Sequence, residues 1–282
     1  MSIGGVVRLF KATPQGSVGD GGRMALADHL RELRARLMRS VAVFVVFFVV
    51  GLFFYDQLLD AVMGPYTDAV EALDQEVQSS AYIKGAAGPL LLQLKLSGLA
   101  AIVVSSPYWL YQIWAFIVPG LHAHEKRWSK LFMAVAGPLF ALGVATGYYV
   151  LPKGLEVLIG FTPDRLENLV EFGEYFSFFT RMLLIFGVSF EIPLFVVLLN
   201  LAGVVSAKSL GDHRPWIILG TFIFAAVATP STDPFSMIML AAPMTLLFLA
   251  SELIARFTDR RRRRRDEAET LGDDEATPVD RL

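Results

Sequence analysis

Three glutamates lie in sequence surroundings where a carboxylate needs a chemical reason. Glu32 is in HLRELRARL and Glu125 is in LHAHEKRWSKL, and both segments are rich in bases. Glu191 is in GVSFEIPLF, inside a long apolar run. Each of the first two carboxylates either pairs with a neighbouring base or receives a guanidinium group from a partner, since an arginine fork matches a carboxylate bidentately. The residues alone leave both alternatives open.

Glu191 carries an energetic cost, because a charged side chain at the centre of a membrane-spanning helix costs about 3 kcal/mol on insertion scales. It is therefore either a functional group or a protonated carboxyl that bonds a neighbouring helix or lines a wet groove. Pro193 follows closely and predicts a kink at this polar position. Lys95 and Arg181 also fall inside apolar runs, near one end, where snorkelling to the interface accounts for their charge.

The elements that position these residues are apolar runs long enough to cross a bilayer. Of the 282 residues, 54% are hydrophobic and 18% are charged, as expected of a protein whose solvent is largely lipid. We expect an all-α, polytopic membrane protein with six transmembrane helices. The fifth is short, and either a thinned bilayer or shielding by other helices would accommodate it. The expected spans are 37–55, 90–118, 131–151, 175–202, 216–229 and 235–254.

Basic residues alternate between the two sides of these spans. They are concentrated before the first span, in the connectors 119–130 and 203–215, and after the last span, whereas the other connectors are mainly acidic. By the positive-inside rule, both termini are cytoplasmic. We expect a multi-pass protein of the plasma (inner) membrane, in which two connectors form short helices that could cap the external face.

Composition predicts three regions along the chain. Residues 1–23 are Gly-rich and expected to be disordered, 24–257 form the six-span membrane domain, and 258–282 form a basic, then acidic, disordered tail. MALADHLRELRARL predicts an amphipathic helix running into the first span, and its Met24 is a candidate natural start. No removable signal peptide is expected. The arginines of 260–265 would anchor at anionic lipid headgroups.

Enzymatic chemistry has little support in the motifs. The chain has no phosphate-binding loop and no GxSxG elbow, and Trp128 occupies the second histidine position of an HExxH pattern. Cysteine is absent. We expect no enzyme activity, no metal, no cofactor and no nucleic-acid partner. One function that the residues leave open is that of an ion-coupled small-solute transporter with Glu191 as its proton carrier, although no internal repeat supports it.

Several motifs occur in a characteristic order: HLRELRARL before the first span, SSPYWLYQIWAFIVPGL before HEKR, FGVSFEIPL in the fourth span, and TPSTDPFS between the fifth and sixth. Together they resemble TatC, the multispanning subunit of the twin-arginine protein translocase, over residues 24–257. The resemblance implies a concave, glove-shaped bundle that recognises signal peptides with two adjacent arginines. It implies export of folded proteins, driven by the proton motive force, with TatA and TatB in a multimeric complex.

The resemblance also assigns residues. It places Glu32, Arg34 and Glu125 in signal-peptide recognition, and Glu191 in a polar, hydrated intramembrane site. Many family members have glutamine where this chain has Met237, so we expect apolar contact with a partner helix there. The positions implied in partner contact or in structure are Pro65, Phe116, Thr229, Asp233 and Met237.

Overall fold

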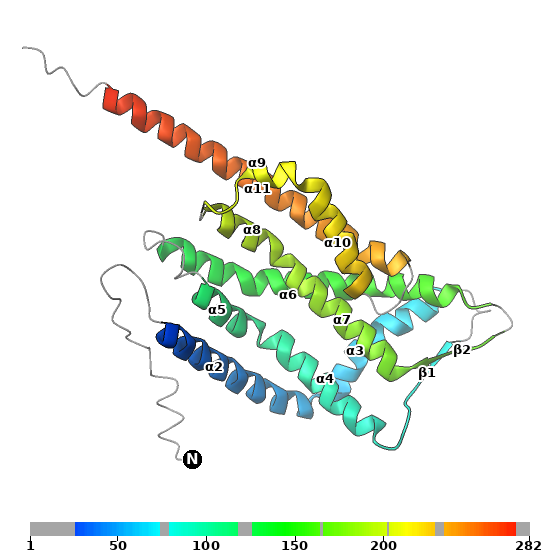
Figure 1. Ribbon diagram of the computed structural model, residues 1–282. Coiled ribbons are helices and arrows are strands. Elements are labelled where there is room, and N and C mark those ends of the chain that lie inside the picture. The colour runs from blue at the N-terminus through cyan, green and yellow to red at the C-terminus, as the bar shows by residue number, and fades with distance from the viewer. Residues whose placement is uncertain are drawn as a thin grey trace, which may run out of the picture. The chain divides into compact units, whose positions relative to one another are not determined.

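The computed structural model describes residues 26–73, 79–117, 126–163, 166–201, 203–228 and 234–274. Over these residues the chain is almost entirely helical, which confirms the predicted all-α class (Figure 1). Two compact units divide it: unit 1 is Met1–Gly187 and unit 2 is Val188–Leu282. The predicted N-terminal extension, 1–23, lies outside the described residues.

The first helix of unit 1, α2 (Leu26–Phe53), is continuous, as HLRELRARL and the apolar run after it predict. It packs along α4 (Gly88–Val104) and α5 (Ser106–Ile117). Gly51 allows the close approach to α4, because a Cβ at this position would lie 3.2 Å from the Cα of Ser97. The small residues thus bring the two backbones together.

The predicted span 90–118 is broken rather than straight. α4 and α5 meet at Ser105 with a bend of 55°. Pro107 has no N–H to donate, which favours the interruption. The indole Nε1 of Trp109 donates a 2.9 Å hydrogen bond to the carbonyl of Ile102, and so satisfies an acceptor in the last turn of α4.

Three further helices complete the main packing of unit 1. α6 (Lys126–Gly160) packs on α3 (Tyr55–Glu71) and on α5. α6 also crosses α7 (Phe172–Phe190) closely, since a Cβ on Gly143 would lie 2.6 Å from the carbonyl oxygen of Phe186. Any larger residue at position 143 would therefore force the backbone of α6 or α7 to shift.

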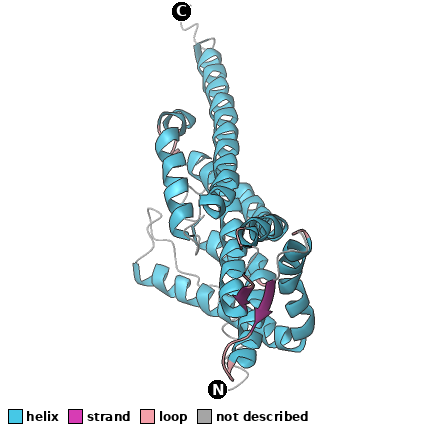
Figure 2. Ribbon diagram, turned by 90° about the vertical axis from the view of Figure 1, so that its right-hand side faces the viewer, coloured by secondary structure: helices cyan, strands magenta, loops and turns pink. Residues whose placement is uncertain are grey.

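The connectors of unit 1 contain one element that was predicted in part and one that was unexpected. The helix expected at 66–78 is described only as the end of α3, which runs from Tyr55 to Glu71. The helix expected in 152–176 is not a separate one, because α6 continues to Gly160 and α7 begins at Phe172. Two short strands, β1 (Ser79–Tyr82) and β2 (Asn168–Glu171), also pair in parallel, with Ser79 opposite Asn168, and Figure 2 shows them side by side. Local pattern could not indicate this pairing, because the two strands come from different connectors.

Unit 2 is built around one long helix, α11 (Pro234–Asp274). α8 follows the break at Glu191, and the short α9 is capped by Ser206, whose hydroxyl accepts a 3.1 Å hydrogen bond from the backbone N–H of Ser209. Leu210 of α9 packs with Phe248 of α11 in the core. The helices of this unit are α8 (Ile192–Leu201), α9 (Ala207–Asp212), α10 (Arg214–Ala228) and α11 (Pro234–Asp274).

The C-terminal tail differs from the expectation. α11 continues through Asp274, so residues 258–274 are helical rather than disordered. Arginine, glutamate and alanine are good helix formers, and they extend a helix that the preceding span has already nucleated. The remaining residues, 275–282, lie outside the described part of the chain.

The described helices supply most of the predicted spans. Four are long and apolar enough to cross a membrane: Leu30–Phe53, Ala134–Gly160, Phe172–Leu201 and Met237–Arg261. The bent pair of α4 and α5 is a fifth if it counts as one span. α10 has 15 residues, and it is about 22 Å long against a hydrocarbon core of about 30 Å, so it is short, as its sequence predicts.

Candidate functional site

Glu32, the first of the three glutamates, lies near the start of α2. Its Oε1 accepts a 2.9 Å hydrogen bond from Nε of Arg36 and a 2.5 Å bond from Nη2 of the same guanidinium. Nη1 of Arg36 also donates to Oε1 of Gln112 on α5, at 3.3 Å. Gln112 is only 6% exposed, so a buried amide fixes the arginine that holds the glutamate. Among the described residues, Oε2 of Glu32 accepts no hydrogen bond.

The predicted recognition residue Arg34 lies on α2, and Phe116, predicted to act in partner contact or structure, lies on α5. Arg34 is exposed, and it is two positions from Glu32, so the two side chains point to different faces of the helix. Phe116 is half-buried and lies one helical turn beyond Gln112, on the same face of α5. Arg34 therefore points away from the contacts among Glu32, Arg36 and Gln112, whereas Phe116 lies on the face of α5 that carries Gln112. Glu125 lies outside the described residues.

Pro65 is buried in the middle of α3, where a proline normally leaves a helical carbonyl without its donor. The freed group is the carbonyl of Ala61, and Oη of Tyr148 on α6 donates a 3.0 Å hydrogen bond to it. Oη of Tyr175 donates to the next carbonyl, that of Val62, at 2.5 Å. Tyrosines from α6 and α7 thus stabilise the polar backbone around this proline and tie α3 to the rest of unit 1.

Glu191 lies at the break between α7 and α8, at the position where Pro193 predicts a kink. Its backbone N–H bonds to the carbonyl of Val188 at 3.0 Å, and its own carbonyl accepts from the N–H of Phe195 at 3.0 Å. Pro193 cannot donate to the turn before it, so the helix is interrupted here. The side chain is half-buried, and its Oε1 is shielded from solvent. A carboxyl group is therefore held within an apolar span of 30 residues.

The predicted partner-contact positions are only partly described. Met237 is half-buried in the first turn of α11. Thr229 and Asp233, which come between α10 and α11 in the sequence, lie outside the described residues.

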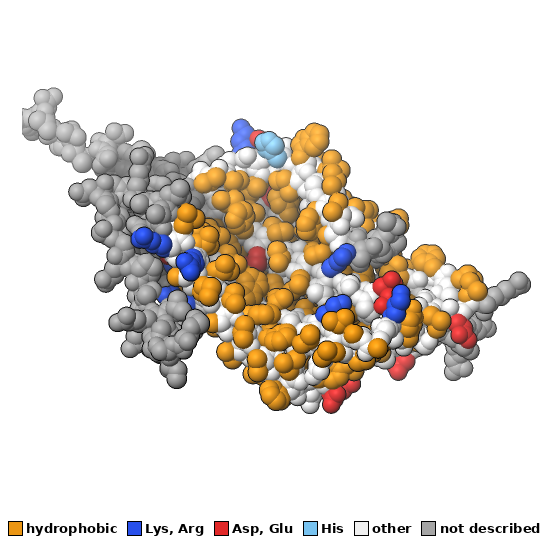
Figure 3. All heavy atoms as spheres, turned by 60° about the horizontal axis from the view of Figure 1, so that its bottom comes forward, with side chains coloured by type: hydrophobic (Ala, Val, Ile, Leu, Met, Phe, Trp, Pro, Cys, Tyr) orange, Lys and Arg blue, Asp and Glu red, His pale blue; other side chains and the backbone are white. Residues whose placement is uncertain are grey.

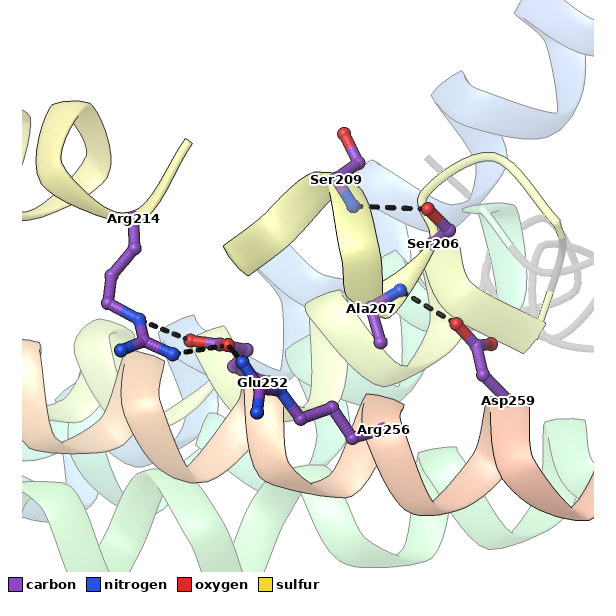
Figure 4. Close-up of polar contacts among 7 residues, drawn as sticks. All are labelled: Ser206, Ala207, Ser209, Arg214, Glu252, Arg256 and Asp259. Atoms are coloured by element: carbon purple, nitrogen blue, oxygen red, sulfur yellow. Dashed lines mark hydrogen bonds and ion pairs between the residues drawn. The ribbon is translucent and has the colours of Figure 1, made fainter. Parts of the chain in front are cut away.

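An ion-pair cluster in unit 2 was missed by the sequence analysis. Figure 4 shows Glu252 of α11 held by two guanidinium groups, from Arg214 at the start of α10 and from Arg256 one turn further along α11. Arg214 donates to both carboxylate oxygens, at 2.7 and 2.9 Å, and Arg256 donates to Oε1 at 2.6 Å. Glu252 is 2% exposed. The i,i+4 spacing with Arg256 was a signal in the sequence, but Arg214 is 38 residues away.

A second carboxylate extends this cluster along α11. Asp259 accepts a 2.7 Å hydrogen bond from the backbone N–H of Ala207, at the start of α9, and a 2.8 Å bond from Nδ2 of Asn200 on α8 (Figure 4 shows the Ala207 bond). Side chains of α11 therefore fasten α8, α9 and α10 at one end of unit 2.

These features define a class of protein. Hydrophobic side chains cover much of the described surface in Figure 3, with few charged groups among them. A surface of this kind, together with four or five spanning helices, is that of a polytopic α-helical membrane protein.

Comparison with known proteins identifies the family. The model of the family "Sec-independent protein translocase protein (TatC)" matches residues 28–243, and the chain belongs to this family. It is 43% identical over 267 residues to the TatC protein of Frankia casuarinae, covering 92% of this chain and 73% of that relative. It is 33% identical over 244 residues to TatC of Escherichia coli, covering 86% and 92% of the two chains.

A solved structure has the same fold. The crystal structure of the twin-arginine translocase receptor TatC superposes with a TM-score of 0.70 at 30% sequence identity, covering 81% of this chain and 98% of that one.

Proposed function

We propose that this chain is the receptor and core component of a twin-arginine translocase, which binds twin-arginine signal peptides and, with TatA and TatB, exports folded proteins. The family match over residues 28–243 carries the proposal, since the relatives are named as translocase proteins. Their role is transport rather than catalysis. The proton motive force would drive the export.

The arrangement around Glu32 suggests how a peptide arginine would bind. Arg36 holds Oε1, and it has a second acceptor in Gln112. A guanidinium from the peptide would bind at Oε2, and Arg36 could turn away from the carboxylate and keep the bond to Gln112. The basic neighbour thus keeps Glu32 hydrogen-bonded and oriented until exchange with the ligand.

The remaining predicted residues have proposed roles in the same function. Glu125 would receive the second arginine of the peptide, and Arg34 and Phe116 would flank the site. Glu191 would keep the interior of the bundle hydrated. TatA or TatB would contact the turn that carries Thr229 and Asp233, with Met237 giving an apolar contact.

The protein's setting follows from the same proposal. It would lie in the plasma membrane with both termini in the cytoplasm, within a multimeric complex, and with the basic end of α11 at anionic headgroups.

Site-specific photocrosslinking tests the recognition site. A crosslinker at position 32 or 125 should label a twin-arginine peptide, and labelling should be lost when both peptide arginines are changed to lysine. Glu32→Lys should abolish export, whereas Glu167→Lys, an exposed charge reversal next to β2, should leave export intact. Equal labelling of both peptides, with normal export by Glu32→Lys, would show that recognition lies elsewhere.

The rival function is solute transport with Glu191 as proton carrier. It requires solute-dependent flux by the purified chain in vesicles, whereas the receptor gives none without TatA and TatB. Family membership favours the receptor.

A further inference from the structure

A pocket of about 120 Å³ lies in unit 1, beside β2 and the first turns of α4 and α7. Its lining combines two kinds of chemistry. Lys84, Lys95 and Glu171 supply charge, and the apolar part includes Leu91, Phe172 and Phe176. None of these residues has a part in the recognition site at the start of α2.

The two lysines are available to a ligand. Both are exposed, and neither forms a hydrogen bond or an ion pair with any residue in the described part of the chain. Lys95 is also two turns inside the apolar helix α4, where its ammonium group must reach a polar partner at the interface. With one carboxylate against two ammonium groups, the pocket has a net positive charge and favours an anion.

The helix ends around the pocket reinforce this preference. α4 begins at Gly88, which lines the pocket, and no side chain caps this end with a hydrogen bond. The N–H groups of Gly88 and Leu91 donate to the carbonyls of Gly85 and Ala87, and Pro89 has none, so it is the positive dipole end of the helix that favours negative charge here. The carboxylate of Glu171 lies beside the neighbouring helix instead, since its Oε1 would be 3.5 Å from a Cβ on Gly173, in the first turn of α7. The end of α4 and the two lysines are thus left for the ligand.

The apolar lining favours a ligand that carries hydrocarbon as well as negative charge. A free inorganic anion would gain nothing from Leu91 and Phe176, whereas a molecule with a phosphate group joined to hydrocarbon would bury apolar surface there. Lys95 also lies close to the start of the apolar helix α4, where a lysine reaches the headgroup layer, and this position favours a pocket beside that layer. The charge and the lining both fit a phospholipid.

We propose that this pocket binds the headgroup phosphate of an anionic phospholipid from the adjacent leaflet. Lys84 and Lys95 bind the phosphate oxygens, and Leu91 and Phe176 contact the glycerol end of an acyl chain. Glu171 limits the affinity by its own negative charge. The lipid would hold the start of α4 next to the start of α7, separately from signal-peptide binding.

Native mass spectrometry of the purified full chain tests the site. The protein is taken from micelles that contain equal amounts of phosphatidylglycerol and phosphatidylcholine, and retained lipids are counted. The native chain should keep one phosphatidylglycerol that the double variant Lys84→Gln, Lys95→Gln loses, with an affinity lower by about tenfold. Glu171→Gln should bind more tightly. The double variant Lys84→Arg, Lys95→Arg should keep the lipid, which separates loss of charge from misfolding.

Lys153→Gln is the matched control, because Lys153 is an exposed lysine of α6 that pairs with Glu156 at 2.8 Å and does not line the pocket. It should retain the lipid. Equal retention by the native chain and the Lys84→Gln, Lys95→Gln variant would overturn the site. Equal retention of phosphatidylcholine would overturn the preference for an anionic lipid. Displacement of the lipid by glycerol phosphate at equal concentration would show a site for free phosphate instead.

Discussion

Tyr148 donates its hydroxyl hydrogen to the carbonyl of Ala61, the acceptor that Pro65 leaves without a helical donor. A side chain of α6 therefore replaces a backbone donor of α3. This relationship explains how a buried proline is accommodated in the interior of a helix. It also makes Pro65 a structural residue, whose effects on function would act through the position of α3.

The Tyr148 bond predicts a specific non-additivity. Tyr148→Phe should destabilise the protein by about 1 kcal/mol, a fall in Tm of about 3 °C, because the carbonyl of Ala61 loses its donor. Adding Pro65→Ala should reverse the loss, since the new backbone N–H donates to that carbonyl. Thermal unfolding in lipid nanodiscs measures both. The control is Tyr149→Phe, at a residue that is 83% exposed. If Tyr148→Phe and Pro65→Ala each lowered the stability and their losses added in the double variant, the proposed bond to the carbonyl of Ala61 would be contradicted.

Gln112 should influence peptide binding without touching the peptide. Gln112→Leu removes the second acceptor of Arg36, so displacing Arg36 from Glu32 becomes more costly. We expect the affinity for a twin-arginine peptide to fall about fivefold, measured by fluorescence anisotropy. Gln93→Leu is the control, because Gln93 donates to the carbonyl of Leu52 at the other end of α2. An unchanged peptide affinity of Gln112→Leu would rule out the proposed replacement of Arg36 by a peptide arginine at Glu32.

The Glu252 cluster should stabilise unit 2. Glu252→Ala leaves two arginines facing each other without their carboxylate, and we expect a loss of about 2 kcal/mol, since both arginines are half-exposed and regain water. Glu156→Ala, which breaks an exposed pair with Lys153, should cost less than about 0.5 kcal/mol. Protease susceptibility of the α9 region and the unfolding temperature report the difference. Similar losses in both variants would refute a special role for the cluster.

The orientation in the membrane is directly measurable, because the chain contains no cysteine. Ser80→Cys in β1 and Asp212→Cys in α9 introduce single exposed thiols in connectors predicted to lie on opposite sides. In intact cells, a membrane-impermeant maleimide should label position 80, and position 212 only after the membrane is opened. The reverse labelling would invert the predicted topology.

The expectations that held were those based on local composition. The helix through HLRELRARL, the break near Pro193 and the short α10 depend on residues that are close in sequence. The break at Ser105, the β1–β2 pairing and the Arg214–Glu252 pair were not predicted, since each depends on packing or on partners distant along the chain.

The sequence by itself determined the apolar spans, the family motifs and the three glutamates, because hydrophobic length and charge are properties of residue type. Tertiary structure alone decided which groups meet. It placed Arg36 between Glu32 and Gln112, gave the carbonyl of Ala61 a donor from α6, and gathered two lysines and two helix starts around one pocket. The physical reason is that a hydrogen bond or an ion pair needs contact within a few ångströms, and in these cases the helix packing provides it.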